Sequence, residues 1–340
     1  MISSETFLVR PVRANDFGQI WDLANEIGYG FTSFPKDNAF VEAKIQRAVN
    51  SFAGIEKEEP LYLLVLEDIS TGKMIGFSGI EAKIGKASPF YNFKINTVCQ
   101  VCESLGKSIE HKTLHMVNNF QGASELVSLY LHPKFRGHRR GECLSRSRFM
   151  LMAMFAENFN EKVIAEIRGV SDKNGQSPFW DCICSKFFDI DFIEADLLSA
   201  TTNKQFISDL LPREPIYIDL LKDEAANVIG VPHVESHRAM NLLEQEGFYF
   251  NDYIDIFDGG PVVQADLGNI KTVNATKQVV VSNIVNSVNE KMIVASHQDE
   301  FALTLACGKQ NHINEVTLDN ISADLLKVAI GDYVYILNMD

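Results

Sequence analysis

Two kinds of apolar spacing alternate along this chain, and they constrain its fold more than any other feature. Residues 124–131, SELVSLYL, place Val127, Leu129 and Leu131 two apart, so all three are expected on one face of a strand. Residues 38–52 instead carry apolar side chains at helical spacing. Strands and helices that follow one another in this way predict an α+β (mixed α/β) fold, with a central mixed sheet and flanking helices.

The same spacings predict further elements and a second αβ lobe. A helix is expected from Ser236 to Glu246, ending at Gly247 in a left-handed cap that favours glycine. Residues 85–122 are less regular and are interpreted as an insertion. The other expected strands are 6–12, 62–66, 74–81, 162–168 and 188–192, and the other expected helices run from Phe17 to Leu23, from Glu142 to about Asn158 and from Ser177 to Phe188.

The pattern changes again near residue 275, where short β-rich pieces such as VVVSNIV and YVYIL begin. We interpret this stretch as a small C-terminal appendage. The predicted division is therefore a first domain over 1–200 that contains the central sheet, a second αβ lobe over 201–274 and a β-rich region over 275–340.

Charge limits the classes of partner. The 340 residues hold 31 Lys and Arg against 45 Asp and Glu, a net charge of −14, which argues against binding to nucleic acid or to anionic membranes. The longest apolar run, Phe149 to Ala156, is far short of the ~20 residues of a membrane-spanning helix. An anionic ligand would need a locally basic pocket.

The cysteines and the first residues suggest the cytoplasm. The segment MISSETFLVRPVR shows no secretory signal. Cys99 with Cys102, and Cys182 with Cys184, would form a metal site only if the two pairs converged, and small reduced side chains are the plainer interpretation.

A basic loop is the sharpest chemical feature. Between residues 132 and 148, six Lys and Arg face one Glu, a local charge of +5 where a strand ends and a helix begins. Free N–H groups at a helix start, glycines that admit close approach and arginines that bind oxygens in pairs would together cradle a phosphate. A solvated basic face is the alternative. The loop residues predicted to contact such an anionic ligand are Arg136, Gly137, Arg139, Arg140 and Gly141.

The strand SLYLHP followed by FRGHRRGECL resembles the pyrophosphate loop of the GCN5-related N-acetyltransferase superfamily, except that Arg139 stands where a glycine is usual. A closer resemblance is to the arginine N-succinyltransferase family. It rests on phrases spread over residues 7–265: FLVRPV, TSFP, YLLVLED, SELVSLYLHP, SRSRFM, AEIRGVSDKNGQSPFW, PIYIDLL and GFYFNDYIDIFDGGP. The tail from about 275 matches weakly.

The resemblance implies transfer of a succinyl group from succinyl-CoA to the α-amino group of L-arginine in arginine catabolism. Succinyl-CoA would be a co-substrate bound by residues 1–200, an acyl-CoA-binding domain, with Leu129 and Leu131 of the central strand as contacts beside the basic loop. No permanently bound cofactor and no metal are expected. The family's catalytic histidine, a proton donor, falls on His233, and a succinyl-CoA contact falls on Leu129.

The residues themselves leave alternatives for His233. Acyl transfer to an amine requires a base for the ammonium proton and an acid for the leaving thiolate, and an imidazole suits either role. A lone histidine is more often structural. Its spacing to His237 invites a zinc interpretation, but Glu235 is wrongly placed for the helical H-E-x-x-H motif.

A cationic amino acid needs carboxylates. Residues 249–269 hold four Asp and no Lys or Arg, and Glu125 precedes the central strand. Glu125, Asp255 and Asp258 are the predicted substrate contacts, while an exposed turn is the plainer interpretation of Asp266. The candidates for the succinyl carboxylate are Thr32, Ser33 and Arg168.

Two alternatives to the main hypothesis stay open. One is the same chemistry with ornithine or another acyl-CoA, since small changes of chain length shift specificity by only ~1–3 kcal/mol. The other is a non-catalytic acyl-CoA-binding relative. A homo- or hetero-oligomer is also open, with 85–122 and the tail as candidate surfaces.

Overall fold

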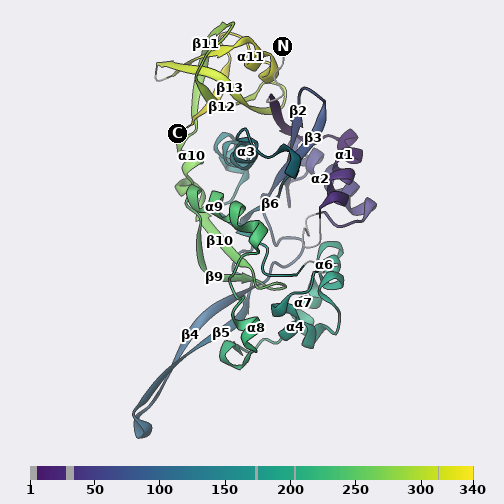
Figure 1. Cartoon of the computed structure of the whole chain (residues 1–340), viewed down its shortest axis with the longest axis vertical. Helices are drawn as coiled ribbons and strands as arrows, with labels where there is room; N and C mark the ends of the chain where they lie inside the picture. The colour runs from purple at the N-terminus through teal and green to yellow at the C-terminus, as the bar shows by residue number, and fades with distance from the viewer. Residues whose placement is uncertain (1–5, 28–33, 173–174, 203, 313, 340) are drawn as a thin grey trace.

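A computed structural model describes residues 6–27, 34–172, 175–202, 204–312 and 314–339. The molecule is elongated, with the C-terminal strands at one end and a long hairpin at the other (Figure 1). In the described residues, fifteen strands form one sheet in the order β12-β15-β11-β14-β13-β1-β2-β3-β6-β7-β10-β9-β4-β5-β8. This arrangement confirms the predicted mixed α/β class with a central mixed sheet.

The element bounds follow in chain order. The strands are β1 (Phe7–Pro11), β2 (Leu61–Asp68), β3 (Lys73–Glu81), β4 (Asn92–Cys102), β5 (Lys107–Val117), β6 (Ser124–Leu131), β7 (Lys162–Glu166), β8 (Ile216–Tyr217), β9 (Tyr249–Asp255), β10 (Pro261–Asp266), β11 (Lys277–Val285), β12 (Lys291–His297), β13 (Phe301–His312), β14 (Glu315–Asp319) and β15 (Tyr333–Asn338). The helices are α1 (Phe17–Glu26), α2 (Asn38–Phe52), α3 (Arg140–Met154), α4 (Pro178–Cys182), α5 (Ser185–Phe188), α6 (Phe192–Thr201), α7 (Gln205–Leu210), α8 (Asp223–Ala226), α9 (His237–Glu246), α10 (Lys271–Ala275) and α11 (Asn320–Leu326).

Alternation along β2 explains why helices cover both faces of the central sheet. Leu64 and Leu66 pack in the same cluster as the buried side of α3, whereas Leu63 and Val65 pack with α1 and α2. Both faces of this strand are therefore apolar. Such a doubly covered sheet gives the site a rigid base, since protein interiors are closely packed.

The prediction that Val127, Leu129 and Leu131 share one face is wrong. Val127 packs with the α1/α2 cluster, while Leu129 and Leu131 pack with the α3 cluster on the opposite face. The cause is a β-bulge: the register of β6 on β3 shifts here, and Ser128 adopts a φ of 59°. An extra residue reverses the alternation beyond it.

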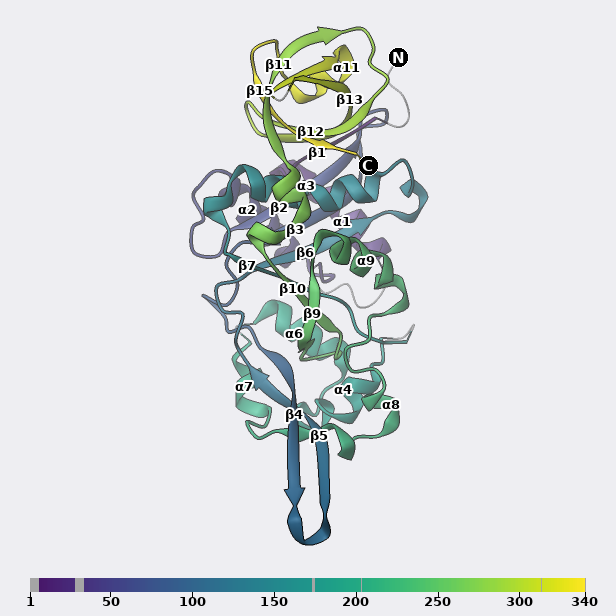
Figure 2. The same ribbon diagram turned by 90° about the vertical axis from the view of Figure 1, so that its left-hand side faces the viewer.

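Residues 85–122 are not an irregular insertion, because most of them form a regular hairpin. β4 and β5 pair continuously from Asn92 opposite Val117 to Cys102 opposite Lys107. The turn closes at Gly106 in the left-handed region. Figure 2 shows this hairpin projecting from the body as a two-stranded ribbon. Its alternating polar side chains hid it, since a solvated ribbon has no continuous apolar face.

The expected strand at 188–192 is also wrong. Asp189 is left-handed, and the carboxylate of Asp191 accepts the N–H of Glu194 to cap α6. The N-cap signal therefore dominates over the short apolar run. The expected helix from Ser236 is confirmed as α9, which ends at Gly247 with a φ of 102°.

The C-terminal region is β-rich, as expected: β11 to β15 lie beyond residue 275, and they extend the main sheet. Val9 of β1 pairs with Leu303 of β13, and the Thr304 hydroxyl donates to the Phe7 carbonyl at 2.6 Å. Boundaries at 200 and 274 stay a prediction. Within the described part of the chain, no helix has both the length and the apolarity needed to cross a membrane.

Candidate functional site

The centre of the candidate site is a gap between two parallel strands. β6 and β7 pair only at their beginnings, Ser124 with Val163 and Glu125 with Ile164, among the described residues. Beyond them, β6 bulges at Ser128, whose buried hydroxyl has no hydrogen-bond partner in the described structure. The downstream half of β6 thus leaves backbone groups on the β7 side available to a ligand.

The basic loop lies at the far end of β6. Three consecutive residues, Gly137, His138 and Arg139, have φ values of 116°, 47° and 58° before α3 begins. A Cβ on Gly137 would meet no atom within 4 Å, so glycine is required there by its backbone and not by crowding. This run of left-handed residues turns the chain sharply into the first turn of α3.

The arginines of this loop that are predicted to contact the anionic ligand differ in exposure. Arg136 is exposed, whereas Arg140 is buried and directs a guanidinium nitrogen toward the Phe135 carbonyl at 3.4 Å. The Arg139 Nε donates to the Glu142 carboxylate at 2.9 Å. Glu142 therefore offsets part of the charge that the sequence assigned to Arg139.

Four carboxyl groups gather near the start of β6. Glu125 lies opposite Glu81 of β3, and its electrostatic neighbours include Asp255. Burial, with these acids against Lys204 and Lys44, raises the pKa of Glu125 to about 7. We call Glu125, Glu166, Asp255 and Asp258 the acid cluster. Burial raises the pKa of all four, and neighbouring carboxylates add to this for Glu125, Glu166 and Asp258.

Two lysines accompany the acid cluster. Lys44 of α2 places its ammonium 4.7 Å from the centre of the Phe34 ring, and burial lowers its pKa to about 8 despite attraction by Glu81 and Glu125. Lys204, between α6 and α7, interacts with the cluster and lowers the pKa of Glu125. Buried carboxylates that outnumber nearby cations favour a positively charged ligand.

The segment just past β7 joins the acid cluster to His233. The Asp258 carboxylate accepts the N–H groups of Gly169, at 2.6 Å, and Gly260, at 2.8 Å. Gly169 forms a β-bridge with Pro232, and the His233 N–H donates to the Arg168 carbonyl at 2.8 Å. The histidine is thus tied to the strand that also carries Glu166.

The His233 ring is half-buried and held on more than one side. Its Nδ1 accepts the Glu235 N–H at 3.2 Å. Burial and the nearby Arg168 guanidinium lower its pKa, against opposing effects of Glu235 and of a hydrogen bond with the Ser171 backbone. Lowering this pKa below its usual range favours a neutral ring at pH 7.

Comparisons with known proteins identify the family. A family model described as "Arginine N-succinyltransferase beta subunit" matches residues 7–272. The chain belongs to the arginine N-succinyltransferase family. A relative named arginine N-succinyltransferase from Enterobacter sp. (strain 638) is 37% identical over 98% of this chain and 97% of its own. One from Escherichia coli O6:H1 is 41% identical over 81% of this chain and 80% of its own.

A solved structure agrees over the full length. The arginine/ornithine succinyltransferase subunit AI from Pseudomonas aeruginosa has a TM-score of 0.89, 32% identity and 98% coverage of both chains. The resemblance inferred from the quoted phrases is therefore confirmed, as is the expectation of an acyltransferase that uses a CoA-derived co-substrate. The C-terminal tail, which shares few phrases with the family, nevertheless lies within the alignments to the Enterobacter relative and the Pseudomonas aeruginosa structure.

The fold gathers the predicted acids but adds residues that the sequence did not single out. Glu125, Asp255 and Asp258 come together, and Glu166 joins them from β7. Its signal was a lone acidic residue within the largely apolar strand KVIAEI. Asp266, which was interpreted as an exposed turn residue, instead ends β10 and pairs with Lys162 at 2.6 Å.

The remaining candidates lie apart from the acid cluster or beyond the description. Arg168 donates to the Ser171 hydroxyl at 2.8 Å beside His233. Thr32 and Ser33 lie outside the described residues. No three His, Cys, Asp or Glu side chains in the described ranges are arranged to hold a metal ion.

Proposed function

We propose that the chain transfers the succinyl group of succinyl-CoA to the α-amino group of L-arginine, by direct attack in a ternary complex in the cytoplasm. The observation that carries this proposal is the placement of two opposite charge environments on one strand. Glu125 and the acid cluster stand at the start of β6, and the basic loop follows its end at Leu131. Six residues of strand separate them, about 20 Å at ~3.3 Å per residue.

The basic loop would hold the diphosphate of the acyl-CoA. Arg136 is the exposed cation, Gly137 permits the sharp turn, and the first-turn N–H groups of α3 around Gly141 favour an anion. Arg140 would position the loop through its contact with Phe135, and Arg139 would balance Glu142. Leu129 and Leu131 would form the wall along which the cofactor's arm reaches the bulge.

The acid cluster would hold the cationic amino acid. Glu125, Glu166 and Asp255 are the proposed partners of the guanidinium, while Asp258 is already engaged by two backbone N–H groups. Binding a cation lowers the cost of ionising buried carboxyl groups, so the ligand and the ionised cluster stabilise each other. Arg168, beside His233, is the proposed partner of the succinyl carboxylate.

His233 would move the protons. The neutral imidazole accepts a proton from the substrate's ammonium, and the free amine attacks the thioester carbon. The C–N bond forms as the C–S bond breaks, the imidazolium returns the first proton to the departing CoA thiolate, and the attacking nitrogen releases its second proton to solvent as the amide forms. A backbone N–H of β6 near the bulge would stabilise the oxyanion, the role proposed for Leu129. No bound metal or permanent cofactor enters this scheme.

A panel of acyl-CoAs crossed with amino acids tests the proposal by release of free thiol. Rapid thiol release is expected with succinyl-CoA and arginine. Ornithine belongs in the panel because the similar Pseudomonas aeruginosa structure is named an arginine/ornithine succinyltransferase subunit. Binding of succinyl-CoA without turnover on any amine would contradict the proposal and favour a non-catalytic relative.

A further inference from the structure

The β4–β5 hairpin ends in an arm that contacts nothing else in the described structure. Its last contacts with the body are at His111, which pairs with Asp219 and packs edge-on against Tyr217. All twelve residues from 99 to 110, which we call the arm, are exposed. The arm projects clearly beyond the body in Figure 2.

This arm exposes apolar side chains where water is the only neighbour. Val101 is 71% exposed, Leu105 69% and Ile109 48%. A two-stranded ribbon in water is at best marginally stable, and its open edges favour association. The arm contains no proline and its pairing has no bulge, two of the devices that normally protect such edges. These features favour a protein partner at the arm.

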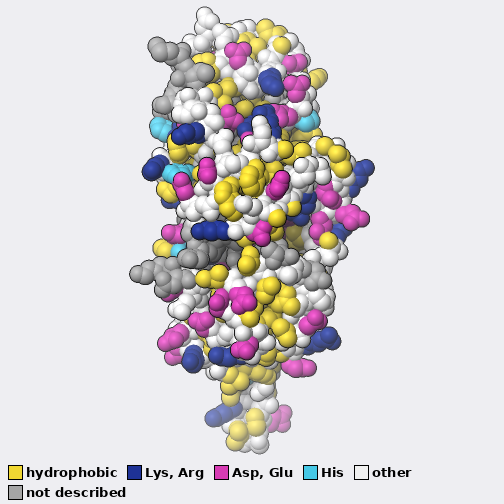
Figure 3. Space-filling model, turned by 90° about the vertical axis from the view of Figure 1, so that its right-hand side faces the viewer, with side chains coloured by type: hydrophobic (Ala, Val, Ile, Leu, Met, Phe, Trp, Pro, Cys, Tyr) yellow, Lys and Arg dark blue, Asp and Glu magenta, His cyan; other side chains and the backbone are white. Residues whose placement is uncertain are grey.

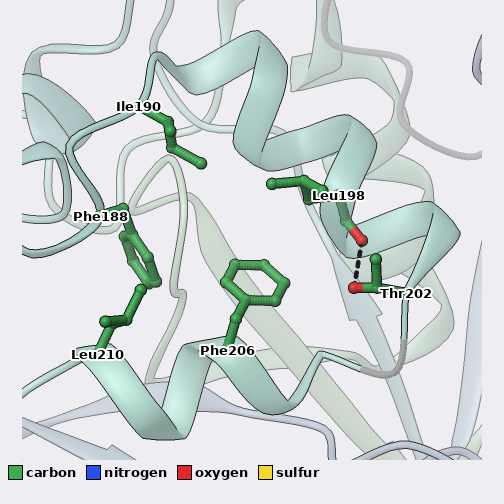
Figure 4. A pocket seen from close by; sticks show the side chains of 6 residues that line it. All are labelled: Phe188, Ile190, Leu198, Thr202, Phe206 and Leu210. Carbon is green, nitrogen blue, oxygen red and sulfur yellow. Dashed lines mark hydrogen bonds between the residues drawn. The ribbon is translucent and has the colours of Figure 1, made fainter.

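An apolar cavity of about 400 Å³ lies on the lobe from which the arm emerges. Its walls come from α5 to α7 and the segments between them. Figure 4 shows their side chains directed toward a common space, and they are Phe188, Ile190, Leu198, Thr202, Phe206 and Leu210. Phe188 and Phe206 belong to the same hydrophobic cluster as Phe93 and Leu114, at the base of the arm. Apolar side chains are also visible on this lobe and on the arm in Figure 3.

We propose that the arm of one copy docks its apolar tip into this cavity of a second copy, and that the exchange is reciprocal. Two arms that run antiparallel about a two-fold axis bring each tip toward the lobe of the other copy, which carries the cavity. A tip leucine or valine and an apolar cavity are complementary in chemistry. Each chain supplies both halves, which makes a second copy the fitting occupant.

The expected interface area selects the reciprocal arrangement. Standard interfaces bury about 800 Å² per partner over 20–30 residues, or roughly 30 Å² per residue. With twelve arm residues and six cavity residues per copy, a reciprocal exchange buries about 1,100 Å² in total, just above the ~1,000 Å² of a specific interface. One arm in one cavity would bury only about half as much, too little for a stable dimer.

Charge does not oppose this approach. The chain carries −14 overall, so two copies repel each other at long range. Residues 97–112, the arm together with its base, contain two Glu and two Lys, so this end of the hairpin is neutral apart from His111. A neutral, projecting element is the part of such a molecule that reaches a second copy at least electrostatic cost.

Sedimentation velocity of the purified full chain tests the assembly. The wild type should sediment with twice the 38.1 kDa of one chain at micromolar concentration. Combining Val101→Asp with Leu105→Asp should raise the dimer dissociation constant by at least about 30-fold, as for interface hot spots. Ile55→Asp is the matched control, because Ile55 is also 71% exposed but lies after α2, and it should leave the dimer intact.

A monomeric wild type, or a dimer that survives both arm substitutions, would overturn the proposal. Far-ultraviolet circular dichroism confirms that each variant is folded. A second variant joins Val98 to His111 through an Asn-Gly turn, which removes the arm and leaves the body's contacts in place. This shortened chain should be folded and monomeric.

Disulfide trapping tests the docking site itself, with Cys99 and Cys102 first changed to Ser. A chain carrying Leu105→Cys, mixed with one carrying Leu210→Cys, should form a covalent heterodimer on oxidation, since Leu210 lines the cavity. Neither chain alone should cross-link efficiently. Cross-linking of the Leu105→Cys chain with itself would mean that the tips meet each other, and would overturn the assignment of the cavity.

Discussion

Glu125→Gln is expected to stabilise the ligand-free protein while it weakens binding of the cationic substrate. Burial, together with the other acids of the cluster, raises the pKa of Glu125 from 4.5 to about 7. One pKa unit corresponds to about 1.4 kcal/mol, so ionising this carboxyl group in the empty protein costs about 3 kcal/mol. Glutamine keeps the shape of the side chain and removes that cost.

The sign of the pH dependence follows from proton linkage. Because the folded pKa lies above the unfolded one, the stability contributed by the neutral carboxyl group is complete below 4.5 and is lost as the pH rises to about 7. Glu125→Gln cannot ionise, so its unfolding free energy does not fall in this way as the pH rises. Its advantage in unfolding free energy should be below about 1 kcal/mol at pH 5 and should reach about 3 kcal/mol at pH 8.

Urea unfolding at pH 5 and pH 8, followed by circular dichroism, measures this difference. Glu42→Gln, an exposed change on α2, is the matched control and should shift neither curve. In steady-state assays at pH 8, Glu125→Gln should raise the KM for arginine by at least about tenfold, the usual effect of losing a charged hydrogen bond. The wild-type KM should fall as the pH rises through 7. A variant less stable than the wild type at pH 8, or one with an unchanged arginine KM, would refute this reasoning.

Three further predictions concern proton transfer, the cofactor and the packing behind the site. His233→Ala should lower kcat by about 10²-fold while acyl-CoA still binds, whereas His237→Ala on the exposed side of α9 should change kcat little. In the wild type, the lowered pKa of His233 should let turnover persist at pH 6.5 and decline only in more acidic buffer, as a pH–rate profile would show. Arg136→Gln should raise the KM for succinyl-CoA about tenfold in titrations at fixed arginine and leave the arginine KM unchanged. Gly260→Ala should cost about 3 kcal/mol or more in thermal or urea unfolding, because its Cβ would lie 2.1 Å from a backbone oxygen, while Gly268→Ala, with no atom within 4 Å, should be nearly neutral.

The sequence predicts the central elements because local spacing and burial agree there. The helix expected over 38–52 and the strand over 124–131 are found with those bounds, since both are rich in apolar side chains that pack against the core. It could not predict the bulge within that strand. Ser128 is an ordinary residue for a strand, and its left-handed backbone is imposed by pairing with β3 and the parting of β6 from β7.

The acid cluster could also be predicted only in part. The sequence predicts Asp255 and Asp258 as site residues because every charged residue in 249–269 is acidic. It predicts Glu125 because of its place beside the central strand. Glu166 was missed because its proximity depends on β7 lying between β6 and β10, which is a property of the sheet order. Local patterns find candidate groups, but long-range pairing decides which of them meet.

The pairing of β1 with β13 has a consequence for how the protein is made. Val9 can reach its partner Leu303 only after all the residues between them have been synthesised. Until then, β1 can pair with β2 alone, and its other edge stays open to incorrect partners. Contacts so distant in sequence also slow folding, because the closure of a long loop must precede them. The β1–β13 pairing therefore makes synthesis of β13 a condition for covering both edges of β1.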